Sequence, residues 1–201
     1  MHEILFCRGR DGGEVTHTTD VLFGDVNPGG KLPVTFPRKT GQTPIYYARN
    51  LTHSPEGRPM YSQRYWDGAV APLYPFGFGL SYTTFSIADL KVSAPQVKLG
   101  EEVTVTADVA NTGSVAGDEV VQLYIHQKAG RDSRPMRELK GFERVTLRPG
   151  EKRTVAFRLG PDELRYWSTS AGAWVQDAEA FDVWVGADST ATLSASFTVV
   201  P

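Results

Sequence analysis

The pattern of apolar and polar residues changes near Thr84. Beyond this residue, apolar and polar side chains alternate with a period of two in several short runs, at 103–109, 121–125, 155–159, 181–185 and 193–199. This alternation is typical of strands that bury one face. Turn-forming residues separate the runs at 99–100, 111–113, 148–151 and 186–189. The pattern therefore predicts a β-sandwich over residues 84–201.

Residues 1–83 are rich in proline and glycine and show little alternation. Residues 14–24 are compatible with a short helix that ends near Gly24, and Lys31–Phe36 with a short strand. The stretch from Pro37 to Ala71 has no clear periodicity. A long irregular segment inside a compact domain usually has a function or packs on a partner. The pattern alone predicts an irregular first part.

Composition excludes several classes of function. The chain has 201 residues and a net charge of −2, which gives no electrostatic reason to bind nucleic acid or an anionic membrane. Its apolar runs are too short to span a bilayer. Cys7 is the only cysteine, and the four histidines lack metal-ligand spacing, so we expect no disulfide, metal or cofactor. The first residues lack the features of a signal peptide, and the sequence leaves the compartment open.

The most specific motif lies at residues 72–85, Pro-Leu-Tyr-Pro-Phe-Gly-Phe-Gly-Leu-Ser-Tyr-Thr-Thr-Phe. Its two glycines permit a close approach to another surface, and its aromatic residues bury large areas. Further motifs occur upstream at 21–37 and downstream at 111–113, 117–124 and 134–142. In order and spacing, these motifs resemble the C-terminal end of glycoside hydrolase family 3 enzymes of the bacterial β-glucosidase type.

The resemblance implies a mainly β chain with two parts. Residues 1–83 would be the incomplete terminal segment of the family's α/β sandwich domain. Residues 84–201 would be an immunoglobulin-like, fibronectin type III-like β-sandwich. The longer enzyme, which we call the parent enzyme, would hydrolyse β-linked sugars, above all β-D-glucosides, by a retaining mechanism without a cofactor. A periplasmic or extracellular parent enzyme is compatible with the resemblance.

The resemblance also implies that this chain has no catalytic residue. A retaining glycosidase needs two carboxyl groups about 5–5.5 Å apart. In the family these come from an N-terminal barrel and from an earlier part of the α/β domain, so both would lie outside this chain. The partners expected for it are these missing domains and, through the parent enzyme, a β-glucoside. Alone, the chain should be inactive.

Two groups of residues are candidates for binding. Arg64, Tyr65 and Trp66 could contact a sugar, because aromatic faces stack on sugar rings, or could instead belong to an ordered loop that packs on the missing domain. A second group is predicted at the interdomain interface: Phe76, Phe78, Tyr82, Arg134 and Arg137. The two arginines lie in a long loop, and the guanidinium group makes directed hydrogen bonds to acceptors on a neighbouring domain.

The acidic residues near these motifs are given structural roles. Asp118 and Glu119 are interpreted as a solvated turn before a strand, with side chains on opposite faces. Asp25 is predicted to cap backbone amides. Glu138 is predicted to form an ion pair near Arg137 and Lys140.

Two other hypotheses remain open. The chain could be a stand-alone carbohydrate-binding or interaction module, which would display an exposed aromatic surface; Trp167, Trp174 and Trp184 are the candidates. Trp184 is out of phase with the core positions of its run and should point outward or against a partner. Alternatively, the chain could be a gene fragment without an independent role. The genomic sequence upstream of Met1 would distinguish a fragment from a module.

Overall fold

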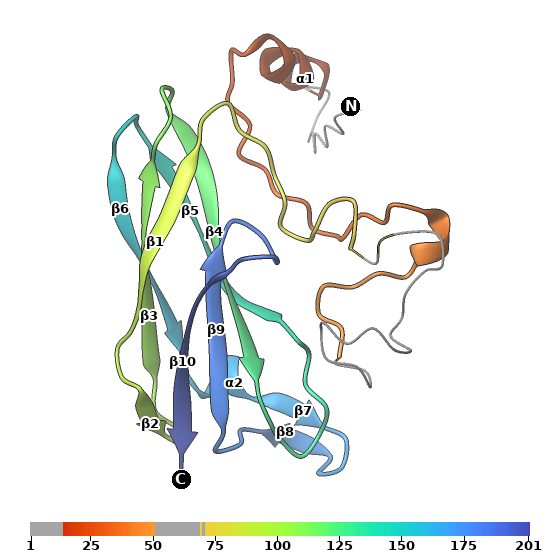
Figure 1. Cartoon of the computed structure of the whole chain (residues 1–201), viewed down its shortest axis with the longest axis vertical. Coiled ribbons are helices and arrows are strands. Elements are labelled where there is room, and N and C mark those ends of the chain that lie inside the picture. The colour runs from red at the N-terminus through yellow and green to blue at the C-terminus, as the bar shows by residue number, and fades with distance from the viewer. Residues whose placement is uncertain (1–13, 51–68, 70) are drawn as a thin grey trace.

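The computed structural model describes residues 14–50, 69 and 71–201, and most of the chain after Phe85 forms a β-sandwich (Figure 1). One sheet has three strands, in the order β1 (Phe85–Val92), β3 (Val103–Asn111) and β6 (Lys152–Leu159). The other has five, in the order β2 (Gln96–Lys98), β10 (Leu193–Val200), β9 (Ala180–Gly186), β4 (Gly117–Gln127) and β5 (Glu138–Leu147). This confirms the β-sandwich that the alternation predicts.

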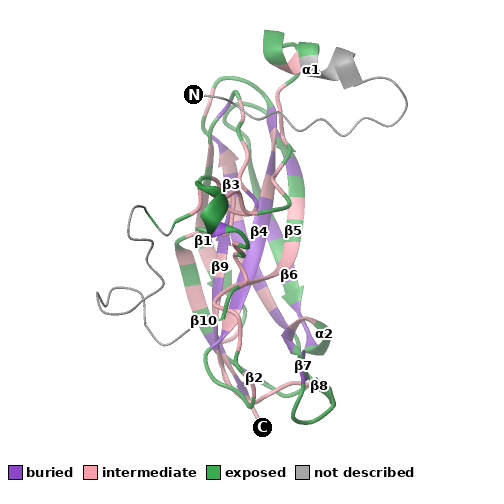
Figure 2. Cartoon of the chain, turned by 90° about the vertical axis from the view of Figure 1, so that its right-hand side faces the viewer, coloured by how far each residue is buried: buried purple, intermediate pink, exposed green. Residues whose placement is uncertain are grey.

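The core lies between the two sheets and is built from the alternating residues. In β3, Val103, Val105, Ala107 and Val109 are buried while the residues between them are only partly covered (Figure 2). The facing sheet contributes Phe181 and Phe197, whose rings stack at 5.3 Å. Each fully buried valine, leucine or phenylalanine stabilises the fold by about 1.5–3 kcal/mol relative to exposure. The period-two pattern therefore identifies the residues that hold the sheets together.

Asn111 fixes one end of the sandwich. Its Nδ2 donates to the carbonyl groups of Val115 and Leu147, at 2.8 and 3.0 Å. Its Oδ1 accepts a hydrogen bond from the Thr83 hydroxyl at 2.7 Å. Because Asn111 is buried and fully bonded, it ties the end of β3 to β5 and to the residues that precede β1.

A small hairpin lies at the opposite end of the sandwich from the N-terminal helix (Figure 1). After β6, the short helix α2 (Pro161–Leu164) begins with a proline, whose missing N–H costs nothing at a helix start. β7 (Tyr166–Ser168) then pairs antiparallel with β8 (Ala173–Val175). This hairpin forms a separate two-stranded sheet.

The first part of the chain has little regular structure, as expected. The helix α1 (Glu14–Phe23) confirms the prediction for residues 14–24, and η1 (Thr40–Gln42) is a single 3₁₀ turn. The predicted strand at Lys31–Phe36 is wrong, since only Phe36 forms an isolated bridge, to Tyr74. Pro33 lacks an N–H to donate, and the residues opposite are themselves rich in proline and glycine. The predicted boundary between residues 83 and 84 falls just before β1, and independent folding of the two parts stays a prediction.

Candidate functional site: the covered outer face of β4

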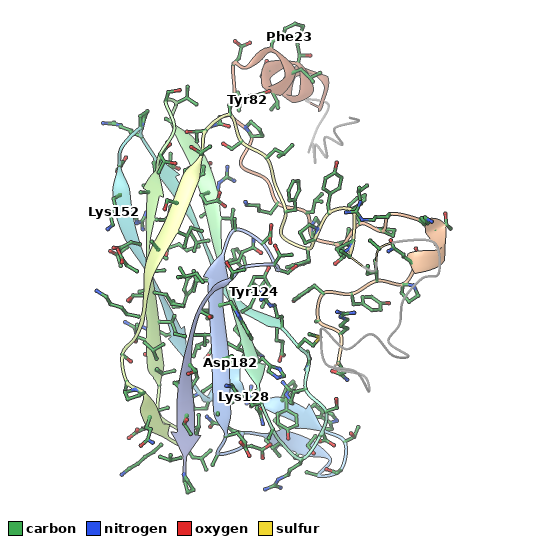
Figure 3. All side chains as sticks on the ribbon, in the orientation of Figure 1. Phe23, Tyr82, Tyr124, Lys128, Lys152 and Asp182 are labelled. Atoms are coloured by element: carbon green, nitrogen blue, oxygen red, sulfur yellow. The ribbon has the colours of Figure 1, made fainter. Side chains whose placement is uncertain are left out.

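The outer face of β4 is buried, although a sandwich usually exposes such a face to solvent. Val121, Leu123 and Ile125 point into the core, as the alternation predicts. Gln122 and Tyr124 point the other way, yet only 3% and 0% of their surfaces are exposed. Figure 3 shows Tyr124 on the side of the sandwich that faces the first part of the chain. Another segment must therefore cover this face.

That segment is a pair of extended stretches, residues 27–37 and 72–82, which we call the strap. The two stretches run side by side in opposite directions (Figure 1). Leu32 donates its N–H to the Phe78 carbonyl at 2.8 Å, and Gly77 donates to the Leu32 carbonyl at 2.8 Å. Farther along, Phe36 donates to the Tyr74 carbonyl at 2.9 Å. These bonds satisfy backbone groups that the strap would otherwise bury unpaired.

The two glycines of the 72–85 motif allow this close packing, as the sequence predicts. A Cβ at Gly77 would lie 2.2 Å from Gln122 Oε1, and one at Gly79 would lie 2.3 Å from the Gly30 carbonyl oxygen. Gly77 also has a φ of +81°, which side chains rarely tolerate. Gly77 therefore allows the strap to lie close to β4, and Gly79 allows the two stretches of the strap to lie close to each other.

Gln122 and aromatic rings join the strap to the sheet. Gln122 Nε2 donates to the Gly77 carbonyl at 3.2 Å and to the Ala187 carbonyl at 2.6 Å, while its Oε1 accepts from the Tyr124 hydroxyl. Tyr47 stacks on Phe76 at 4.2 Å and meets Tyr124 edge-on at 5.8 Å. Burial raises the pKa of both tyrosines, so each stays a neutral hydrogen-bonding group.

A buried ion pair adds to this contact. Lys31 Nζ of the strap lies 2.7 Å from Glu119 Oε1 of β4, and the two side chains are 15% and 8% exposed. The interpretation of Asp118 and Glu119 as a solvated turn is therefore wrong, because both lie within β4 and Glu119 is covered by the strap. Asp118 contacts Arg144 and accepts from the Thr146 hydroxyl at 2.6 Å. The Thr146 hydrogen bond, supported by Arg144, holds the pKa of Asp118 below its usual value.

Asn27 anchors the start of the strap. Its Nδ2 donates to the Ala116 carbonyl at 2.9 Å, and its Oδ1 accepts from the Ser81 hydroxyl and the Tyr82 N–H, each at 2.9 Å. Sequence reasoning chose Asp25 for such a role and missed Asn27. The signal was the Asn-Pro-Gly-Gly turn that Asn27 begins, since asparagine readily bonds nearby backbone groups.

Of the aromatic residues predicted at an interdomain interface, two pack within this chain and one is exposed. Phe76 packs on Tyr47 within the contact described above, and Phe78 stacks on Tyr74 at 5.0 Å inside the strap. Tyr82 is 53% exposed, and its hydroxyl donates to the Val21 carbonyl of α1. Their interdomain role stays a prediction.

Arg134 and Arg137 contact the sandwich itself. Arg134 lies 4.1 Å from the ring centroid of Tyr166 and pairs with Glu138 at 2.8 Å, which confirms the ion pair predicted for Glu138. Arg137 lies over the Trp184 ring at 4.5 Å and donates to the Ser189 carbonyl at 2.7 Å. Trp184 thus lies on the outer face of β9, as its phase predicts.

The long loop between β4 and β5 meets the first part of the chain through its backbone. Met136 donates its N–H to the Arg49 carbonyl at 2.8 Å, and Asn50 and Pro135 form an isolated bridge. Leu139 donates its N–H to the Tyr47 hydroxyl at 3.4 Å. Contacts between this loop and residues 47–50 therefore extend the strap contact along the same face. An interdomain role of the two arginines stays a prediction.

An exposed groove of mixed polar and apolar lining lies beside α1. Leu22, Phe23, Tyr82 and Val115 contribute to its lining, and Phe23 is 80% exposed. Figure 3 shows Phe23 and Tyr82 at the end of the molecule where α1 lies. Exposed aromatic and aliphatic side chains grouped in this way usually mark a contact surface.

The predicted sugar contacts cannot be located in the structure. Arg64, Tyr65 and Trp66 lie outside the described residues. Within residues 14–50, 69 and 71–201, no three histidine, cysteine, aspartate or glutamate side chains are grouped so that they could hold a metal ion. No helix in the described part of the chain is long and apolar enough to cross a membrane.

Comparisons with known sequences agree with this division. Residues 5–82 match the glycosyl hydrolase family 3 C-terminal domain, and residues 119–189 match the fibronectin type III-like domain. The chain therefore combines a segment of the first domain, which includes the strap, with a fibronectin type III-like β-sandwich. It is homologous to the C-terminal parts of family 3 β-glucosidases and β-xylosidases.

Particular relatives support this assignment. A periplasmic β-glucosidase of Salmonella typhimurium is 44% identical over 194 residues, which are 94% of this chain and 25% of that protein. A β-xylosidase of Formosa agariphila is 44% identical over 172 residues, 86% of this chain and 23% of that protein. The β-glucosidase of Listeria innocua in complex with glucose superposes with a TM-score of 0.84 at 35% identity, over 92% of this chain and 26% of that one. The chain thus spans about a quarter of the length of these relatives.

Proposed function

We propose that this chain is the C-terminal part of a retaining β-glucosidase-type glycoside hydrolase and supports the catalytic domains without supplying their carboxylates. The similarity to the Salmonella and Listeria β-glucosidases supports this assignment, since it extends over both parts of the chain. The names of these relatives favour a β-glucoside as substrate of the parent enzyme and a periplasmic location. The mechanism requires no cofactor.

One observation carries the supporting role: the strap buries the outer face of β4. The segment that matches the family 3 C-terminal domain supplies Lys31 and Gly77, and the sandwich supplies Glu119 and Gln122. Separating the two parts would break these buried contacts and expose the outer face of β4 to water. The sandwich therefore acts as a rigid base that fixes the end of the α/β domain.

The carboxylates near the strap have structural partners. Asp118 contacts Arg144, Glu119 contacts Lys31, and Glu138 contacts both Arg134 and Lys140. A nucleophile and a general acid must instead face a substrate at the spacing given by the mechanism. We therefore assign no catalytic role to these residues.

The groove beside α1 is the proposed contact surface for the rest of the α/β domain. Leu22 and Phe23 would lose their exposed apolar area there, and about 25 cal/mol is gained for each Å² of apolar surface removed from water. Tyr82 and Val115 lie on the sandwich side of the same groove. This contact would include Tyr82 in the interdomain interface.

Assays of the chain alone and of a chimera test the proposal. The chain should show no hydrolysis of 4-nitrophenyl β-glucoside above the buffer rate. A chimera that joins it to the N-terminal three quarters of the Salmonella β-glucosidase should be soluble and active. Activity of the chain alone that survives repurification would contradict the supporting role, as would full stability and activity of the truncated Salmonella enzyme without any replacement.

A further inference from the structure

The β7–β8 hairpin displays two exposed tryptophans. Trp167 and Trp174 are directly opposite each other on the paired strands, with ring centroids 5.9 Å apart and an interplanar angle of 78°. Their side chains are 53% and 59% exposed. The perpendicular arrangement is a favourable aromatic pairing and stabilises a short hairpin.

Hairpin stabilisation does not account for the exposure. More than half of each tryptophan still faces solvent, although tryptophan is the side chain with the largest apolar area to bury. By contrast, Trp184 on β9 is mostly covered, and the guanidinium group of Arg137 lies over its ring. Exposed tryptophans in adjacent positions are typical of a binding surface.

A charged hydrogen-bond donor lies beside the pair. The guanidinium carbon of Arg165 is 5.3 Å from the ring centroid of Trp174, and Arg165 pairs with Asp162 at 3.0 Å. The side chain of Arg165 is about half exposed, so some of its N–H groups remain available to a ligand. The ion pair with Asp162 restricts the orientation of the guanidinium group. The hairpin thus combines apolar ring faces with a directed donor.

We propose that Trp167, Trp174 and Arg165 form a binding site for a β-linked glucan chain. The C–H faces of a β-linked pyranose ring are apolar and carry a slight positive charge, so they pack on the electron-rich face of an indole. The sugar hydroxyl groups accept hydrogen bonds from a guanidinium group. The choice of a glucan rests on the proposed function, and relatives such as the Listeria enzyme were solved with glucose and with laminaribiose.

The location of the hairpin is compatible with a long ligand. It lies at the end of the sandwich away from α1 (Figure 1), and its β7–β8 turn is exposed (Figure 2). A glucan bound there could extend into solvent on either side without moving the strap. The site would attach the parent enzyme to a polymeric substrate and raise the local concentration of chain ends.

Nuclear magnetic resonance tests the site directly. The indole N–H signals of the 201-residue chain are followed while laminarihexaose or cellohexaose is added to millimolar concentration, and W167F and W174F assign two of the signals. Shifts of the Trp167 and Trp174 signals, with the Trp184 signal unchanged, are expected. W167A and W174A should each weaken binding by about tenfold or more. W184F is the matched control and should leave the Kd unchanged.

Other results would overturn the site. No shift of either signal, or shifts confined to Trp184, would exclude binding at the hairpin. If W167F and W174F lowered the thermal midpoint as much as the alanine variants did and no oligosaccharide bound, the tryptophans would serve only the hairpin. Concentration-dependent dimerisation in sedimentation, abolished by W174A, would assign this surface to a second copy of the chain.

The outcome can be separated from that of the proposed function. If the chimera hydrolyses β-glucosides but the hairpin binds no oligosaccharide, only the glucan site fails. If the hairpin binds cellohexaose or laminarihexaose but the chimera has no β-glucosidase activity, the proposed function fails and the glucan site stands.

Discussion

At the scale of single residues, polar groups on the outer face of β4 specify how the strap packs. Gln122 bonds two carbonyl groups and one hydroxyl group, so a change of register would leave several buried groups without partners. A buried polar group left unpaired costs about 1–3 kcal/mol. The strap is therefore held by directed bonds as well as by the apolar area it buries.

Substitution of Gly77 measures how close this contact is. We expect G77A to destabilise the chain more than G150A does in urea unfolding. Both residues have positive φ, +81° and +75°, but no atom lies within 4 Å of a Cβ at Gly150, whereas Gln122 blocks one at Gly77. The difference should be about 1–3 kcal/mol, the usual cost of overpacking. Equal losses of stability for the two variants would mean that the strap does not pack on Gln122 in solution.

The lowered pKa of Asp118 predicts a pH dependence of stability. The folded state stabilises the ionised carboxylate of Asp118 more than the unfolded state does. Asp118 therefore stabilises the fold at pH values above its unfolded pKa of 3.8. This contribution is lost as the pH falls through the lower pKa of the folded state. D118N should therefore destabilise the chain at pH 6 and have little effect near pH 2. Unfolding midpoints measured across this range test the prediction, with D89N as control. A difference between D118N and wild type that is constant with pH would contradict it.

At the scale of elements, the long loop between β4 and β5 packs on the outer surface of the sandwich. Its arginines lie over Tyr166 in β7 and over Trp184 in β9, and the N–H of Met136 in the loop donates to the Arg49 carbonyl. The loop thus connects the hairpin, the five-stranded sheet and the first part of the chain. Its length, unusual for a hairpin connection, is needed to reach all three.

The combined variant R134A/R137A distinguishes an internal role from an interdomain role. The described contacts of both arginines lie in the sandwich, so we expect the variant to lower the stability of the 201-residue chain by about 1–3 kcal/mol in urea unfolding. R158A is the control, because Arg158 is 79% exposed and its ion pair with Glu102 contributes little. A variant that leaves the chain unchanged but destabilises the chimera would assign both arginines to the interdomain interface.

At the scale of the whole molecule, the first part divides into a bound portion and an exposed one. The strap covers β4, whereas α1 extends beyond the sandwich and exposes Leu22 and Phe23 (Figures 1 and 3). Within the first part, the strap should contribute more to the stability of the chain than α1 does, since α1 lacks the surface on which its apolar side chains would pack.

Two truncations test this division. A chain that begins at residue 27 should unfold at nearly the same urea concentration as the full chain. A chain that begins at residue 84 should still unfold cooperatively, because its core between the sheets is complete, but at a lower concentration, because Gln122 and Tyr124 become exposed. Circular dichroism provides the measurement. Equal midpoints for both truncations would show that the strap adds no stability.

Alternation along the chain was sufficient to predict the sandwich. A strand that buries one face must alternate with period two, and this local rule marked the core positions of β3, β6, β9 and β10. The glycines of the 72–85 motif likewise indicated a close approach, although the surface they approach was not evident. The helix α1 was predicted, whereas the strand at residues 31–36 was not found.

The segment that covers β4, in contrast, is evident only in the folded chain. Gln122 alternates with the core positions of β4 and so has the spacing of a solvent-facing residue, whereas Glu119 shares the phase of Val121. Nothing local in the sequence shows that residues about 45–90 positions earlier contact and bury these two polar side chains. The contacts of Asn27 and Tyr47, and that of Arg134 with Tyr166, were hidden for the same reason: they join segments that are distant in the sequence. Alternation reports which face of a strand is apolar, but the burial of a polar face depends on how separate segments meet in space.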